Sequence, residues 1–324
     1  MVDGISIPED WLPFISCNFN RVFVNPASGC RANCAYCYIF DYGHPHTPQL
    51  FEASGGEVKR WLQSQNGFRE GKCGTLISIG ATCDPFDEEV VYKTLEFVEA
   101  FSPMRNPIQL STKYYVSETA AEQLCGFQVE SGQIILFGTI TSFRYWHNLE
   151  PGTHEPHRRL LGLTNAMLRG ISTCLYVKPV LPGITDKEAS LFAQAILEHN
   201  IPYCTLGLAY INDKTLSRIR QRGLPIRELT KRGKSPPPPS KASETKVYAR
   251  ATGTLDTVEL IKPILEVEGT ECVVSAPCVH ALAYGILCPT GVWHYHPELC
   301  VHCRAECSKR LTSTSAQVRD FFIG

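Results

Sequence analysis

The sequence contains no apolar run long enough to cross a membrane. A spanning helix needs roughly 18 to 20 consecutive apolar residues, and no stretch of the chain reaches that length. The opening segment MVDGISIPEDWLPF also lacks the basic region and the following apolar region of a secretory signal. We therefore expect a soluble cytoplasmic protein that does not associate with membranes.

The chain also lacks an excess of charge of either sign. It has 31 basic and 32 acidic residues, which gives a formal net charge of −1 at pH 7. Such a protein has no overall electrostatic attraction for nucleic acid or for a membrane surface. Its 324 residues, of which 44% are hydrophobic, are enough to bury one large core, so we expect one main domain with at most an appended region.

Cysteine, in contrast, is abundant, with 15 residues in the chain. In a long chain without a secretory signal, clustered cysteines bind metal more often than they form disulfides. The first cluster, Cys30, Cys34 and Cys37, has the spacing C-x3-C-x2-C. Scattered cysteines elsewhere are more simply interpreted as small buried side chains.

Strand-like and helix-like segments alternate through the first two thirds of the chain. Repeated strand–helix units predict parallel strands with helices outside them, and strands that are apolar along their whole length fit burial on both faces. We therefore predict an α/β fold, a partial (β/α)6 TIM-like barrel, over residues 1–212. The predicted strands are 21–27, 75–82, 107–112, 133–141, 172–180 and 203–210, and the predicted helices are 56–65, 87–101, 117–125, 155–170 and 185–200.

The composition changes after the predicted barrel. Residues 213–246 are basic and proline-rich, which predicts a loop or linker. Basic side chains there could bind phosphate groups, but aromatic residues for stacking on bases are scarce, so a solvated linker is the simpler interpretation. Residues 247–324 form a small cysteine-rich extension.

Three cysteines in one short loop predict an iron–sulfur cluster with an open coordination position. A [4Fe–4S] cluster is usually held by four thiolates, so three thiolates leave one iron to bind another molecule. A structural zinc ion, with His44 or His46 as fourth ligand, is the alternative. The loop follows the first predicted strand, and we expect it on the functional face because strand-end loops carry the active sites of such barrels.

The cysteine motif, with Tyr36 directly before its third cysteine, resembles the signature of the radical S-adenosylmethionine (SAM) superfamily. The segments GATCDPFDEE, QLSTKYYV, GTITSF and EPHRRL, in this order, resemble the spore photoproduct lyase-like branch over residues 20–210. The resemblance implies that the open iron of a [4Fe–4S] cluster binds SAM. It also implies that an electron, from a donor such as flavodoxin or ferredoxin, cleaves SAM to a 5′-deoxyadenosyl radical that abstracts hydrogen from a substrate.

The resemblance further implies, by position, which side chains contact the cofactor. Simpler alternatives stay open: Arg159 could pair with Glu155 one helical turn away, and Lys113 could lie in solvent. The implied contacts are Tyr36, Thr82, Asp84, Thr112, Lys113, Ser142, Glu155 and Arg159.

Cys83 is the candidate catalytic residue. The lyase branch uses a cysteine near the radical as a hydrogen donor, and Cys83 follows the second predicted strand. A merely buried side chain is the alternative. A Gly-Gly-Glu triplet at 55–57 resembles a SAM-binding element of radical enzymes, but it precedes the second strand, so we interpret it as the start of a helix.

A second cysteine group predicts a second metal site, either zinc or another [4Fe–4S] cluster. Cys272, Cys278 and three histidines, His294, His296 and His302, leave its ligand set open. The group itself, spaced C-x11-C-x2-C-x3-C, consists of Cys288, Cys300, Cys303 and Cys307.

Three functions are compatible with these features. The leading hypothesis is a radical SAM enzyme that acts on an unidentified small-molecule or peptide substrate. One alternative is repair or modification of nucleic acid, as in the spore photoproduct lyase-like branch. The other is a non-catalytic, zinc-stabilised module that binds nucleic acid through the basic segment.

Overall fold

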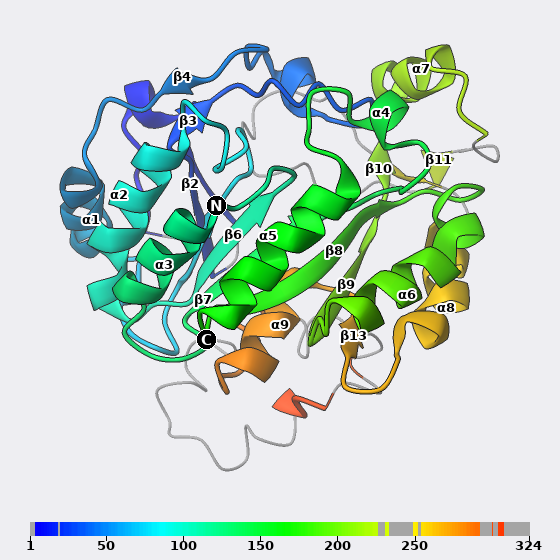
Figure 1. Ribbon diagram of the computed structural model, residues 1–324. Helices are drawn as coiled ribbons and strands as arrows, with labels where there is room; N and C mark the ends of the chain where they lie inside the picture. The colour runs from blue at the N-terminus through cyan, green and yellow to red at the C-terminus, as the bar shows by residue number, and fades with distance from the viewer. Residues whose placement is uncertain are drawn as a thin grey trace.

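The computed structural model describes residues 4–18, 20–225, 231–232, 249–251, 254–291, 300 and 304–307, with the backbone alone at 231–232 and 249–251. Its centre is an eight-stranded sheet (Figure 1). The strands, in spatial order, are β1 (Ile15–Asn18), β2 (Arg21–Val24), β5 (Leu76–Ile79), β6 (Ile108–Thr112), β7 (Ile134–Thr139), β8 (Ser172–Val180), β9 (Tyr203–Leu208) and β13 (Glu271–Val273).

The sheet has the connectivity predicted for a partial barrel. From β2 to β13 every neighbouring pair is parallel, and only β1 pairs antiparallel, with β2. Strands β2 and β5 to β9 fall within the six predicted segments, so the predicted α/β barrel is confirmed. β1 and β13 extend this sheet at its two ends and were not predicted.

Helices cover the outer face of the curved sheet (Figure 1). They contact one another in the order α1–α2–α3–α5, and α6 contacts α8. Five of them match the predicted helices to within a few residues, and the capping box formed by Ser54 and Glu57 confirms that the Gly-Gly-Glu triplet starts a helix. The bounds are α1 (Gly55–Ser64), α2 (Val91–Phe101), α3 (Glu118–Phe127), α5 (Pro156–Leu168), α6 (Ala189–Glu198) and α8 (Thr254–Leu265).

Alternation along the strands separates an apolar outer core from a polar interior. The outward side chains of β5 and β6, such as Ile77, Ile79 and Leu110, belong to the main core beneath the helices. Their neighbours Ser78 and Gln109 point the other way and line the interior of the barrel. Because successive side chains of a strand alternate between its faces, these polar residues reach the interior without disturbing the core.

Where the structure describes them, the residues after 212 pair with strands and pack against the barrel. Helix α7 (Asp213–Gln221) begins the segment predicted as a linker, and β10 (Tyr210–Ile211) pairs with β12 (Ala249–Ala251), which pairs with β11 (Lys231–Arg232). Helix α9 (Ala276–Ala283) packs against β8 and β9. The independent cysteine-rich extension is therefore not confirmed, and the domain boundaries stay predictions.

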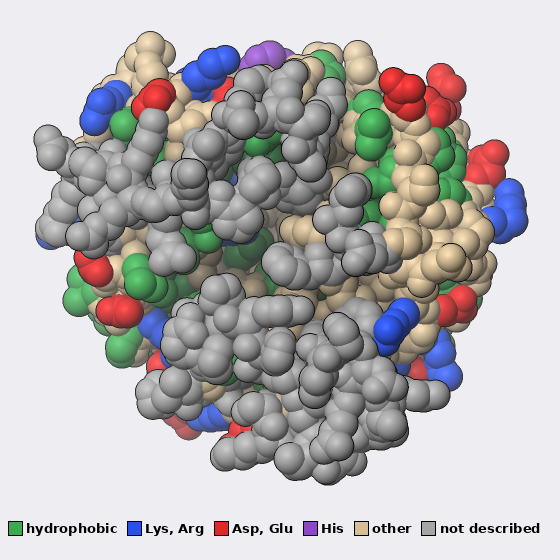
Figure 2. Space-filling model, turned by 180° about the vertical axis from the view of Figure 1, so that it is seen from behind, with side chains coloured by type: hydrophobic (Ala, Val, Ile, Leu, Met, Phe, Trp, Pro, Cys, Tyr) green, Lys and Arg blue, Asp and Glu red, His purple; other side chains and the backbone are tan. Residues whose placement is uncertain are grey.

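The face opposite the helices has a central hollow in which hydrophobic side chains are visible (Figure 2). Among the residues drawn in colour, basic and acidic side chains are mixed around the edge of this face. No helix in the described part of the chain combines the length and the apolar character needed to cross a membrane.

Alanine substitutions at two helical glycines can test how tightly α5 is packed. A Cβ added to Gly162 in α5 would lie 2.6 Å from the backbone nitrogen of Val116, whereas one added to Gly126 in α3 meets nothing within 4 Å. We predict that Gly162→Ala lowers the free energy of unfolding by about 1–3 kcal/mol, because the backbone must shift. Gly126→Ala should raise it by about 0.5–1 kcal/mol through helix propensity.

Urea unfolding followed by circular dichroism measures both changes. Equal effects of the two substitutions would contradict the close packing of α5 against Val116.

Candidate active site

The barrel encloses a cavity of about 450 Å³. Its wall is formed by the loops that follow β2, β5, β6 and β9, and by inward-facing side chains of the strands. Loops at the carboxyl ends of barrel strands are where such folds hold their active sites. The predicted site residues in this wall are Cys30, Cys34, Tyr36, Cys37, Thr82, Cys83, Asp84 and Lys113.

The three-cysteine loop folds closely onto its neighbours. Gly29 has φ of 101°, and a Cβ there would lie 2.5 Å from the carbonyl oxygen of Thr47, so only glycine fits. Its N–H donates to the carbonyl of Thr82 at 3.0 Å, which joins this loop to the loop after β5. The N–H of Cys37 donates to the carbonyl of Cys34, so these two cysteines lie on one turn.

Helix α7 clamps this loop with two arginines. The Arg218 guanidinium pairs with Asp41 at 2.8 Å and donates to the carbonyl oxygens of Ala35 and Cys37. Arg222 donates to the carbonyls of Asn33 and Asn148. Interpreting residues 213–221 as a solvated linker was therefore wrong: this basic segment begins with a helix that holds the cysteine loop in place.

The histidines considered as zinc ligands have other roles. His44 forms a hydrogen bond of 2.8 Å with Ser28, and His46 stacks on Phe40 with ring centroids 4.0 Å apart. Across the described residues, no group of three or more His, Cys, Asp or Glu side chains converges as ligands of one metal ion. In a [4Fe–4S] cluster each thiolate binds a different iron atom. The three cysteines of the loop therefore need not converge on a single metal position to hold such a cluster.

Asp84 ties the loop after β5 to the end of β6. Its carboxylate accepts hydrogen bonds from the Thr112 hydroxyl (2.6 Å), the Lys113 N–H (2.7 Å) and the Phe86 N–H (3.1 Å). Burial raises the pKa of Asp84, and these donors counteract part of the rise. The Thr82 hydroxyl donates to a backbone carbonyl, so Thr82, Asp84 and Thr112 all stabilise the wall of the cavity.

Lys113 directs a buried positive charge toward the cysteine loop. Its ammonium lies 5.8 Å from the ring centroid of Tyr36 and forms no hydrogen bond or ion pair with any described residue. Burial lowers the pKa of Lys113, but Cys34, Glu150 and Asp84 outweigh burial and raise it to about 12. The side chain therefore stays charged at neutral pH and, contrary to the alternative of a solvated strand end, faces the cavity.

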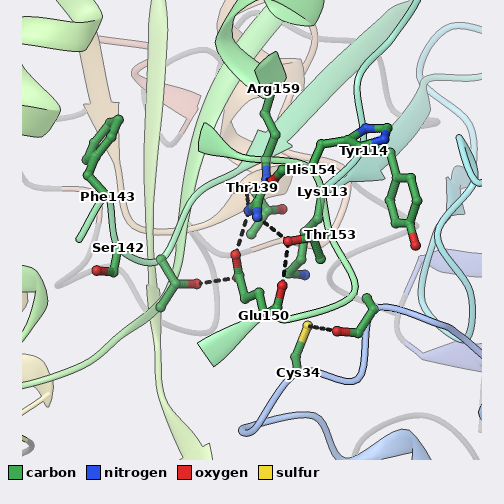
Figure 3. Close-up of polar contacts among 12 residues, drawn as sticks. Cys34, Lys113, Tyr114, Thr139, Ser142, Phe143, Glu150, Thr153, His154 and Arg159 are labelled. Atoms are coloured by element: carbon green, nitrogen blue, oxygen red, sulfur yellow. Dashed lines mark hydrogen bonds and ion pairs between the residues drawn. The ribbon is translucent and has the colours of Figure 1, made fainter. Parts of the chain in front are cut away.

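Arg159 is fully buried, and its partner is Glu150 rather than Glu155 (Figure 3). The guanidinium forms an ion pair with Glu150 and donates to the Thr139 carbonyl and the Thr153 hydroxyl. The sequence pattern missed Glu150, which follows the short helix α4 (Trp146–Leu149) in an irregular segment. Only one consideration could have indicated Glu150 from the sequence: an arginine that is buried needs a carboxylate close to it.

Glu150 also connects this ion pair to the cysteine loop. Its other oxygen accepts hydrogen bonds from the hydroxyls of Tyr36 and Thr141. Burial opposes ionisation of Glu150, but the charges of Arg159 and Lys113 outweigh burial, so the pKa of this carboxyl lies below its ordinary value. One ionised carboxylate thus links Tyr36, beside Cys37, to helix α5.

Four of the predicted cofactor contacts lie outside the cavity wall: Thr112, Ser142, Glu155 and Arg159. The Ser142 hydroxyl is fully buried and donates to Glu188 at 2.8 Å, and Glu188 also accepts from the N–H of Phe143 (Figure 3 shows Ser142 and Phe143). Glu155 is exposed before the first turn of α5. Thr112, Ser142 and Arg159 therefore support the site through other residues rather than line it.

Several cavity residues were not predicted from the sequence. They are polar or aromatic side chains on the inner face of the strands, and the signal that could have identified them is a polar residue at alternate positions of an otherwise apolar buried strand. The set is Arg21, Ser78, Gln109, Ser111, Tyr176 and Lys178.

Cys83 lines the cavity, and its side chain packs with Ala27 and Val90. Burial raises the pKa of its thiol well above the ordinary value, and the neighbouring Cys30 acts in the same direction. The sulfur therefore keeps its hydrogen at neutral pH, as a hydrogen-atom donor must.

The second cysteine group lies only partly within the described residues. The N–H of Cys288 lies 3.4 Å from the sulfur of Cys307, and Cys300 packs against the same small apolar cluster. Cys303 lies outside the described residues, as do His294, His296 and His302. A second metal site here stays a prediction.

Comparison with known proteins supports this interpretation of the fold. No protein-family model matches the sequence. One relative, the "Radical SAM Nalpha-GlyT isomerase" of Pseudomonas phage M6, is 26% identical over 178 residues, which cover 53% of this chain and 36% of the relative. The chain thus matches only about a third of that protein's length.

Solved structures of spore photoproduct lyase share the fold. A variant with bound AdoMet and a dinucleoside spore photoproduct superimposes with a TM-score of 0.59 at 18% identity, covering 81% of this chain and 78% of the lyase. A second variant with the dinucleoside gives 0.58 at 19% identity, covering 84% and 87%. The resemblance to spore photoproduct lyase expected from the sequence is thereby confirmed for the fold.

The ion pair between Glu150 and Arg159 makes a testable contribution to stability. We predict that Glu150→Gln lowers the free energy of unfolding by about 3–5 kcal/mol, because it leaves the buried guanidinium without a counter-charge. The control Glu155→Gln, at an exposed position nearby, should change it by less than about 0.5 kcal/mol. Urea unfolding measures both, and a small effect of Glu150→Gln would show that the ion pair is not needed.

The thiol state of Cys83 can be measured without a substrate. In the folded protein at pH 8, iodoacetamide should alkylate the exposed Cys73 at least roughly tenfold faster than Cys83, because alkylation requires an accessible thiolate. Mass spectrometry of the peptides gives both rates, and urea should make them similar. Equal rates in the folded protein would contradict a buried, protonated Cys83.

Proposed function

We propose that the chain is a radical SAM enzyme whose Cys30, Cys34 and Cys37 hold a [4Fe–4S] cluster. The observation that carries the proposal is the position of these cysteines in the wall of the barrel cavity, with the charged Lys113 beside them. When bound there, the cluster and SAM supply a 5′-deoxyadenosyl radical that abstracts hydrogen from an organic substrate. The shared fold with spore photoproduct lyase supports this assignment.

The residues around the cysteines fit a sulfonium amino acid. Its carboxylate needs a cation, and the Lys113 ammonium faces the cavity without a counter-charge bonded to it. Its amino group needs oxygen acceptors, which the Asp84 carboxylate and the strand-end carbonyls can supply. We assign Thr82 to the same wall, and we assign Tyr36 the role of orienting the loop through its bond to Glu150.

The predicted contacts outside the wall act through other residues in this proposal. Arg159 holds Glu150, and Ser142 holds the loop after β7 through Glu188. Thr112 orients Asp84. Glu155, which is exposed, is assigned no contact with the cofactor. Arg159, Ser142 and Thr112 therefore have positioning roles, since none of these three side chains lines the cavity.

Cys83 is proposed as the hydrogen donor that ends the radical reaction. It lines the same cavity as the three cysteines and remains a protonated thiol. The electron donor, a flavodoxin or ferredoxin, stays a prediction. The fold does not select between small-molecule, peptide and nucleic-acid substrates, and nothing in the described residues favours repair of nucleic acid or a zinc-stabilised binding module over the radical enzyme.

Anaerobic reconstitution with iron and sulfide tests the proposed function. The protein should turn brown and, with SAM and dithionite, release methionine and 5′-deoxyadenosine. Cys34→Ala should retain about four fewer iron atoms per chain than the wild type and release neither product, because three thiolates are needed to hold the cluster. The control Cys73→Ala, at an exposed cysteine outside the cavity, should retain both properties.

Counting iron as a difference between variants makes the test independent of a second cluster. A colourless protein that contains zinc and cleaves no SAM would exclude the proposed function. Equal iron content in Cys34→Ala and the wild type would exclude the proposed ligands.

A further inference from the structure

Arg21 lies inside the barrel at the start of β2 and forms no ion pair with an Asp or Glu among the residues that the structure describes. Its Nε donates to the Ser78 hydroxyl at 2.7 Å, and one Nη donates to Oε1 of Gln109 at 3.0 Å. Both acceptors are neutral, and no described Asp or Glu forms an ion pair with Arg21. Because a guanidinium has five N–H groups and two are used here, the others remain available to a ligand in the cavity that Arg21 lines.

The guanidinium is held in a fixed position. It lies over the ring of Phe23, 4.4 Å from the centroid, while Gln109 is itself oriented by a hydrogen bond of 2.9 Å to the Ser111 hydroxyl. Burial lowers the pKa of Arg21 to about 10, so the group remains charged at neutral pH. A partly buried cation that is held in place without a paired carboxylate among the described residues is costly unless an anion binds to it.

The charges in the cavity wall are unbalanced. Among the described residues that line it, the charged side chains are Arg21, Lys113, Lys178 and one acid, Asp84. Asp84 already accepts three hydrogen bonds from its own loop and from the end of β6. Lys178, on β8, forms no ion pair with a described residue, and its stem occupies space that a side chain at Gly207 would fill.

The position of Arg21 separates it from the cysteines. Arg21 is the first residue of β2, whereas Cys30 comes after the strand has ended, so the two residues lie toward opposite ends of the strand. In the proposed function, the charged methionyl end of SAM binds at the cysteine loop, beside Lys113. An anion at Arg21 therefore has to come from a second molecule.

We infer that the substrate carries an anionic group, a carboxylate or a phosphate, which Arg21 binds in the interior of the barrel. Lys178, on the opposite part of the sheet, supplies a second positive charge to the same cavity. The inference rests on the proposed function in taking this cavity as the substrate site. It adds the chemical class of the substrate, which the fold alone does not give.

Calorimetric titration of the reconstituted protein tests this inference. Phenyl phosphate, benzoate and neutral benzyl alcohol serve as probes, with saturating SAM present so that the site beside Lys113 is occupied. At least one anion should bind more tightly than benzyl alcohol, and the tighter of the two identifies phosphate or carboxylate as the preferred group. Arg21→Gln should weaken binding of that anion by roughly 10- to 100-fold, as expected for hydrogen bonds to a charged group, and change benzyl alcohol binding less than about twofold.

Two further variants control for folding and for general charge. Gln109→Glu keeps the shape of the side chain and supplies Arg21 with a carboxylate, so it should also weaken anion binding while the arginine remains in place. Arg60→Gln removes an exposed arginine on α1, outside the cavity, and should leave anion binding unchanged.

The outcomes separate this inference from the proposed function. The anion site is overturned if neither anion binds the wild type more tightly than benzyl alcohol does. It is also overturned if Arg21→Gln and Gln109→Glu both bind the anion as tightly as the wild type. Either result counts even if the wild type cleaves SAM. Arg21-dependent anion binding by a protein that does not cleave SAM supports the site and excludes the proposed reaction.

Discussion

The buried carboxylate of Glu150 holds the cysteine loop, the barrel and helix α5 in one arrangement. It pairs with Arg159 on α5 and accepts the hydroxyl of Tyr36, which directly precedes Cys37. An ion pair in the interior is costly to desolvate, and this one is compensated by the further hydrogen bonds of Arg159 to Thr139 and Thr153. The geometry of the cysteine loop therefore depends on a contact that contains no cysteine.

A second set of charges holds the same loop from the other side. Arg218 on α7 and Arg222 directly after it donate to the backbone carbonyls of Cys37 and Asn33, and Asp41 forms an ion pair with Arg218. Carbonyl groups in an irregular loop need donors, and long arginine side chains can supply them from a neighbouring helix. The loop is thus fixed from both sides while its thiols remain in the wall of the cavity.

The positively charged side chains around the cavity and the cysteine loop include two kinds. Arg159 and Arg218 are matched by carboxylates and act as structural ties. Lys113 and Arg21 face the cavity without an ion pair to a described residue. The first kind stabilises the fold, and the second leaves binding energy available for ligands. The cavity is thus suited to two negatively charged groups at two separate places.

Much of the architecture could be predicted because its signals are local. Segments such as LISI at 76–79 are apolar along their length and are followed by helices, which is sufficient to predict parallel strands buried on both faces. The short strands β1 and β13 carried no comparable signal and were missed. Helix α7 was missed because its basic composition resembled that of the linker that follows it.

The sequence by itself determined the order of strands and helices and the spacing of Cys30, Cys34 and Cys37, because these depend on residues close together in the chain. Only the tertiary structure decided which charges are paired. Arg159 forms its ion pair with Glu150 rather than with Glu155, which is closer in the sequence. Arg21 donates hydrogen bonds to Ser78 and Gln109, which lie on two other strands. The physical reason is that electrostatic partners are chosen by distance and burial in space, which the order of residues along the chain does not specify.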